Sequence, residues 1–144
     1  MFHYRSHHSK QYNLKGQSLI VAGKINPLKW LISKTEAEKA LKEFGVPIQE
    51  VKKIRCLRHQ ICISYWNING KICCSFFSYR IFQRWLNAVE NLIHDCKNLA
   101  EWETVGDRIE YELSKFFYPR TMANQIWHSL RTHWYQLQST LRIA

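Results

Sequence analysis

Apolar residues recur along the second half of the chain at spacings of one, three and four residues, as expected for one face of an α-helix. Three such segments follow one another, over residues 81–96, 102–116 and 123–141. Tyr118-Pro119 separates the last two, because proline cannot continue a helix. The pattern predicts three consecutive helices, the second with an outward row of carboxylates: Glu103, Asp107, Glu110 and Glu112.

A shorter helix is predicted over residues 34–44. Ser33 and Glu36 match a capping box, in which the serine accepts from a backbone N–H of the first turn and the glutamate reaches back to the cap. Gly45 tolerates the left-handed conformation that closes a helix, and Pro47 prevents the helix from resuming.

The segment from Lys52 to Tyr79 carries the clearest strand signal. Two runs rich in Ile, Cys, Tyr, Phe and Trp flank Asn69-Gly70, a pair that favours a two-residue type I′ hairpin turn. With that turn Ile63 faces Phe76, and both faces of the hairpin carry apolar side chains. We therefore expect a well-covered hairpin, preceded by a more polar stretch that reaches solvent.

Together these elements predict an α+β fold, with a small antiparallel sheet (central hairpin about 52–79) packed by an N-terminal helix and three C-terminal helices. The length of 144 residues suits one domain, so residues 1–144 are expected to form a single unit with a loose basic tail over about residues 1–15. The run QSLIVAG at residues 17–23 fits either a buried strand or an irregular segment.

The cysteines and the hydropathy pattern bear on location. The chain has five cysteines, and its first fifteen residues lack the apolar run of a signal peptide. The longest apolar stretches are far below the ~18 residues that span a bilayer. Free thiols in a reducing compartment, and hence a cytoplasmic location, are the expectation.

Charge is segregated along the chain, with 21 basic and 11 acidic residues giving +10 overall. Residues 51–84 hold seven basic and no acidic side chains, whereas residues 85–112 hold two basic and seven acidic ones. A basic field of this size attracts polyanions at long range.

Signatures of catalysis and of metal binding are missing from the sequence. No cysteine–histidine spacing matches a zinc site, and no glycine-rich phosphate loop is present. Cys73 and Cys74 are adjacent, so in a strand they point to opposite faces. We therefore expect a protein that is not an enzyme and that uses no metal or cofactor.

Basic and aromatic residues give two candidate nucleic-acid surfaces. The first surrounds the hairpin and the next helix: Lys52, Lys53, Arg55, Arg58, Lys71, Arg80 and Arg84. The second is a stripe on the last helix, because eleven residues advance a helix by three turns plus roughly 20°: Arg120, Asn124, Arg131, Gln138 and Arg142. Arginine binds phosphate bidentately, and amides can hydrogen-bond to base edges.

The leading hypothesis is a small basic nucleic-acid-binding accessory protein that contacts the phosphate backbone of DNA or RNA. The alternative is a protein–protein adaptor or assembly factor, an accessory subunit that meets an acidic protein or a ribonucleoprotein complex, since Trp, Tyr and Arg are enriched at interaction hot spots. A third is a small basic toxin or nuclease using His59, His94, His128 or His133. No membrane partner is expected.

Overall fold

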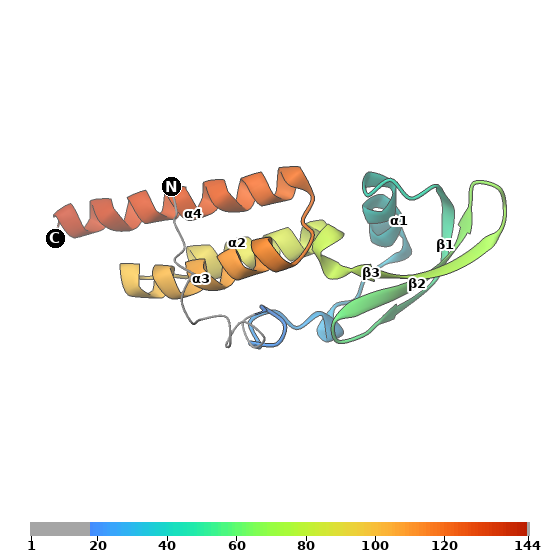
Figure 1. Ribbon diagram of the computed structural model, residues 1–144, viewed down its shortest axis with the longest axis horizontal. Coiled ribbons are helices and arrows are strands. Elements are labelled where there is room, and N and C mark those ends of the chain that lie inside the picture. Colours follow the sequence, from blue (N-terminus) through green and yellow to red (C-terminus); the bar gives the residue numbers. More distant parts are fainter. Residues whose placement is uncertain (1–17, 144) are drawn as a thin grey trace. The chain divides into compact units, whose positions relative to one another are not determined.

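The computed structural model describes the backbone of residues 18–143 and the side chains of residues 18–140. Figure 1 shows the chain, which groups into two compact units. Residues 26–85 form the sheet unit, and residues 18–25 with 86–143 form the helical unit. The predicted tail over residues 1–15 lies outside the described residues, and a single domain over 1–144 stays a prediction.

The sheet unit contains a three-stranded antiparallel sheet in the order β1-β2-β3. Helix α1 precedes the sheet and packs against β1 (Figure 1). The elements are α1 (Lys34–Glu43), β1 (Ile48–Cys56), β2 (Gln60–Asn67) and β3 (Ile72–Ser78). With three C-terminal helices in addition, the predicted α+β fold is confirmed, and the predicted hairpin gains a third strand.

The start and the end of α1 follow the sequence signals. The Ser33 hydroxyl accepts a hydrogen bond from the Glu36 backbone N–H at 3.0 Å, and Gly45 takes a φ of +94° just after the helix. The Glu36 carboxylate, however, is bonded to the Arg84 guanidinium. The serine half of the predicted capping box is therefore confirmed, whereas the carboxylate joins α1 to a distant part of the chain.

The turn between β2 and β3 differs from the predicted type I′ turn. The Asn67 N–H donates to the Lys71 carbonyl at 2.8 Å, so three residues form the loop. Gly70 takes a φ of +79°, whereas no described non-glycine residue has a positive φ. A type I′ turn needs positive φ at both central residues, which excludes it here. The Asn67 side chain supports the loop by accepting from two backbone N–H groups, those of Asn69 and Lys71.

The longer loop moves the pairing of β3 by one residue. Ile63 lies opposite Ser75, and Phe76 lies opposite Cys62. The predicted pairing of Ile63 with Phe76 is therefore wrong. Because side chains alternate between the two faces of a strand, this shift moves every side chain of β3 to the opposite face of the sheet from the predicted one.

Aromatic side chains fill the core of the sheet unit beside Ile61 and Ile63. Tyr79, Phe82 and Trp85 are fully buried. The Tyr79 hydroxyl donates to the Leu57 carbonyl at 2.6 Å, which ties the segment after β3 to the turn between β1 and β2. Burial is also the main reason that the pKa of Tyr79 is raised.

The helical unit contains residues 86–94 of helix α2 (Gln83–His94) and two further helices. Side-chain hydrogen bonds join these helices. The Trp102 indole N–H donates to the Leu130 carbonyl at 2.9 Å, and the Ser129 hydroxyl donates to the Glu90 carboxylate at 2.7 Å. Residues 18–24 form turns rather than a strand, with Leu19 buried. The three helices are α2 (Gln83–His94), α3 (Leu99–Lys115) and α4 (Arg120–Ile143).

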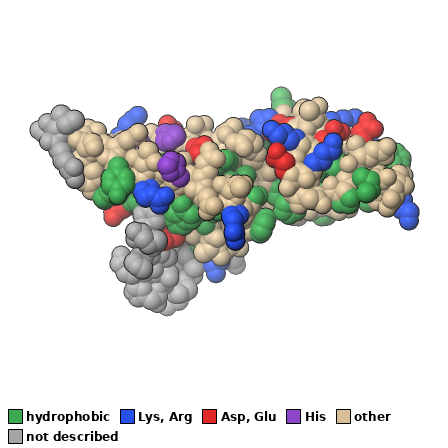
Figure 2. Space-filling model, turned by 90° about the horizontal axis from the view of Figure 1, so that it is seen from above, with side chains coloured by type: hydrophobic (Ala, Val, Ile, Leu, Met, Phe, Trp, Pro, Cys, Tyr) green, Lys and Arg blue, Asp and Glu red, His purple; other side chains and the backbone are tan. Residues whose placement is uncertain are grey.

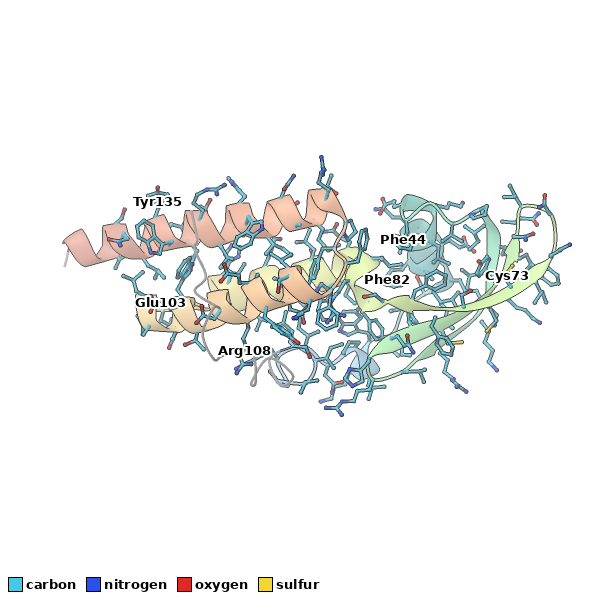
Figure 3. The ribbon with its side chains drawn as sticks, in the orientation of Figure 1. Phe44, Cys73, Phe82, Glu103, Arg108 and Tyr135 are labelled. Atoms are coloured by element: carbon cyan, nitrogen blue, oxygen red, sulfur yellow. The ribbon has the colours of Figure 1, made fainter. Side chains whose placement is uncertain are left out.

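One member of the predicted outward acidic row lies inside the helical unit. Glu103 is exposed on α3 (Figure 3). Glu112, in contrast, is fully buried. Its carboxylate accepts from the Leu19 backbone N–H at 2.8 Å and from the Tyr118 hydroxyl at 2.6 Å. The prediction of an outward Glu112 is wrong, because this carboxylate satisfies donors from two chain segments that pack on α3.

Glu112→Ala is expected to lower the free energy of unfolding by about 3 kcal/mol, because it leaves buried donors without their acceptor. Urea unfolding monitored by tryptophan fluorescence measures the change. Glu103→Ala on the exposed face of the same helix is the matched control, expected within about 0.5 kcal/mol of the parent. Equal effects of the two substitutions would contradict a structural role for the buried carboxylate.

Candidate functional site

The two faces of the sheet differ in how they are covered. Residues opposite one another in an antiparallel pair share a face. Val51, Ile61, Ile63 and Tyr65 lie on one face and are buried. The other face, called here the open face, carries Glu50, Lys52, Lys53, Arg55, Cys62, Ser64, Trp66, Ile72, Cys74 and Phe76.

Large apolar side chains of the open face reach solvent. Trp66 is 36% exposed, Ile72 48% and Phe76 57%. The prediction that the hairpin is covered on both faces is therefore wrong: apolar side chains lie on both faces, but those of the open face stay exposed, and the observed register makes Phe76 rather than Phe77 the exposed ring. In Figure 3, side chains project from the sheet on the side away from α1.

Basic side chains lie on the same face as the exposed rings of Trp66 and Phe76. Lys53 and Arg55 are exposed and pair across β1 and β2 with Ser64 and Cys62. Lys52 sits at an irregularity of β1, and its ammonium nitrogen lies 5.9 Å from the centre of the Trp66 ring. Three cations and one carboxylate, Glu50, thus share a face with exposed aromatic rings, which gives it a positive balance.

The face of the sheet unit that carries α1 has a different charge pattern. Seen from that side, basic and acidic side chains are interspersed (Figure 2). The helix itself alternates Lys34, Glu36, Glu38, Lys39, Lys42 and Glu43. A polyanion therefore finds a net positive surface on the open face and a mixed one beside α1.

The structure separates the seven predicted basic residues of the sheet unit into groups. Lys52, Lys53 and Arg55 lie on the open face, while Arg58 and Lys71 are exposed in the turns at the ends of the strands. Arg80 and Arg84 have partners within the unit.

Arg80 is only 4% exposed, and its guanidinium carbon lies 4.7 Å from the centre of the Trp85 ring. Arg84 holds the Glu36 carboxylate through two hydrogen bonds, of 2.6 and 2.9 Å, and lies 5.7 Å from the Trp30 ring. The hydrogen bond to Glu36 is the main reason that the pKa of Arg84 is raised. Both guanidinium groups therefore have partners inside the sheet unit.

The second predicted surface lies on α4, in the helical unit. The helix is unbroken from Arg120 to Ile143, so the predicted stripe keeps its spacing. Arg120, Asn124 and Arg131 are exposed, and Gln138 is half-buried. The side chain of Arg142 lies outside the described ones. Tyr135, 59% exposed, stands beside this stripe, in contact with Trp134 at 5.0 Å between ring centres (Figure 3).

Sequence reasoning missed a contact between two cysteines on the open face. The sulfur atoms of Cys62 and Cys74 lie 3.5 Å apart. Cys56 pairs with Ile61 and therefore lies on the covered face, away from Cys62. No signal in the sequence identifies the contact, because it depends on the register of β3.

The described residues show no cluster of three or more His, Cys, Asp or Glu side chains able to hold a metal ion. His133 lies near His94, with 5.9 Å between ring centres, and its Nε2 atom is 2.8 Å from the Cys96 carbonyl. That nitrogen must donate to the carbonyl, so His133 ties α4 to the segment that follows α2. Within residues 18–143, no helix combines the length and hydropathy needed to cross a bilayer.

Comparisons of the chain with protein-family models, with curated proteins and with solved structures found no match.

The ion pair of Arg84 with Glu36 is expected to stabilise the sheet unit by about 1 kcal/mol, the upper range for a partly exposed pair. A double-mutant cycle with Arg84→Ala and Glu36→Ala measures this coupling in urea unfolding. Arg55→Ala, on the open face, is the control and should change stability by less than about 0.5 kcal/mol. A coupling of zero would show that Arg84 is available to other partners.

Proposed function

We propose that the chain is a nucleic-acid-binding protein without enzymatic activity, and that the open face of the sheet binds a single strand. The observation that carries the proposal is the combination of cations and exposed aromatic rings on one uncovered face. Lys52, Lys53 and Arg55 would neutralise phosphates, with Arg58 and Lys71 extending the basic surface at its ends. Five free cysteines agree with the cytoplasmic location that forms part of the proposal.

The aromatic side chains favour a single strand over a duplex. Base–aromatic stacking requires a base whose flat face is exposed, and every base has such a face in a single strand. In a duplex the bases stack on one another, so Trp66 and Phe76 would find no partner ring. The proposal is supported by the 5.9 Å contact of Lys52 with Trp66, because an ammonium group that would bind a phosphate lies beside a ring that would stack on a base.

A protein partner is the second candidate, favoured by the 48% exposure of Ile72 and the 57% exposure of Phe76. Such apolar side chains, beside an arginine, are typical of interaction hot spots. An acidic protein would meet the same cations. Binding of an unmodified single strand therefore discriminates between the two candidates.

Trp66→Ala and Phe76→Ala are each expected to weaken binding of a labelled single strand of about 12 nucleotides by about 5- to 150-fold, the value of one stacked base. Trp66→Phe keeps a stacking ring and should retain most of the affinity. Fluorescence anisotropy measures all three, alongside a duplex of the same sequence. Equal affinity for duplex and single strand, or no effect of either alanine, would contradict the proposal and direct the search to an acidic protein.

Lys53→Ala is expected to reduce the slope of log affinity against log salt concentration by about 0.7, because one fewer phosphate is neutralised. Lys39→Ala removes the same charge from the mixed face beside α1 and is the matched control, with no change of slope expected. Arg131→Ala tests the stripe on α4. If Arg131→Ala reduced the slope and Lys53→Ala left it unchanged, the binding site would lie on α4 rather than on the sheet.

A further inference from the structure

Two thiols meet on the open face of the sheet. Cys62 lies opposite Phe76 and Cys74 lies opposite Ser64, so the two cysteines are diagonal neighbours on strands β2 and β3. Their sulfur atoms are 3.5 Å apart, in contact as a weak hydrogen bond. A disulfide bond is about 2.05 Å long, so the sulfur atoms need to approach by about 1.5 Å to form one.

The surroundings of the pair give the two thiols different roles. Cys74 is exposed, whereas Cys62 is half-buried. Arg55 lies opposite Cys62 on β1 and supplies a nearby positive charge. Reactive cysteines are found in such electropositive, partly open places, because the thiolate is the nucleophile.

Hydrogen bonding separates the acidities of the two groups. Hydrogen bonds from Ser64 and from Cys62 lower the pKa of Cys74, and Arg55 acts in the same direction. The hydrogen bond with Cys74 is the main cause of the raised pKa of Cys62. As pH rises, Cys74 therefore loses its proton first, and Cys62 keeps its proton to a higher pH.

The other cysteines provide internal comparisons. Cys96 is buried in the helical unit, and burial raises the pKa of its thiol. Cys73 lies on the covered face of β3, where the Asn67 amide donates to its sulfur at 3.6 Å (Figure 3). Neither cysteine has the exposure of Cys74.

We propose that Cys74 and Cys62 form a thiol–disulfide exchange site that reacts with a low-molecular-weight disulfide such as oxidised glutathione. The Cys74 thiolate attacks one sulfur of the small disulfide, whose S–S bond breaks, and one half leaves as a thiolate that takes up a proton. Cys62 then loses its proton to solvent, and its sulfur attacks the Cys74 sulfur and expels the second half. The two protein thiols are oxidised to one disulfide, and the small disulfide is reduced to two thiols.

In the experiment, the full chain is incubated with oxidised glutathione and the remaining thiols are blocked by alkylation. The mass of the intact chain is then measured, and its peptides are mapped. The expected product has lost two hydrogens and contains a peptide in which Cys62 is linked to Cys74. Cys62→Ser cannot resolve the intermediate and should accumulate one glutathionyl group on Cys74. Cys74→Ser should give neither product, while Cys56, Cys73 and Cys96 stay open to alkylation after unfolding.

A kinetic measurement on the unaltered chain keeps the proposal testable if a variant fails to fold. With limiting iodoacetamide, Cys74 should be alkylated first among the five cysteines. Its rate should rise at a lower pH than the rate of Cys62, because the pKa of Cys74 is lowered and the pKa of Cys62 is raised. Alkylation of Cys74 no faster than Cys73, or absence of the Cys62–Cys74 link, would overturn the proposal. These readouts contain no nucleic acid, so they are independent of the proposed binding function.

Discussion

The loop that joins β2 to β3 fixes the chemistry of the sheet. Gly70 holds a positive φ at its end, and the side chain of Asn67 caps two of its backbone N–H groups. A loop one residue longer than the expected turn moves β3 by one position, and side chains alternate with a period of two. Phe76 therefore emerges on the face that carries Trp66, and Cys74 comes into contact with Cys62. Both the proposed nucleic-acid surface and the proposed exchange site depend on this register.

The segment after β3 explains why the formal charge of the sequence overstates the number of cations available at the proposed binding surface. Tyr79 and Trp85 anchor this segment in the core, and the guanidinium groups of Arg80 and Arg84 pack against tryptophan rings. Arg84 also neutralises Glu36 on α1. These two cations serve the fold of the sheet unit, so a basic run in the sequence combines residues with different functions. Polyanion binding depends on the cations that stay on the surface, and the open face holds three of them.

Local signals predicted the elements well, whereas tertiary placement could not be read from them. Ser33 and Gly45 bound α1 as expected, and apolar periodicity located three helices, because caps and periodicity act over a few residues. The register of β3 was missed, since Asn-Gly fits more than one loop length. The burial of Glu112 was missed because it depends on two donors outside α3. Leu19 is distant in the sequence, and Tyr118 lies beyond the end of the helix. The contact of Cys62 with Cys74 follows from the register and was missed with it.

A second role for the cations of β1 has to be weighed against ligand binding. Both β1 and β3 are edge strands, and lysines on an edge discourage pairing with another chain. If the lysines of β1 served only to prevent edge pairing, β3 would need charged residues as much as β1 does. Its sequence, Ile72–Ser78, contains none, and it exposes Ile72 and Phe76 instead. On the open face the cations therefore lie on β1, while the exposed apolar side chains lie on the other two strands, Trp66 on β2 and Ile72 and Phe76 on β3. Such an asymmetry is expected where a chain of alternating phosphates and bases is bound, and edge protection alone does not account for it.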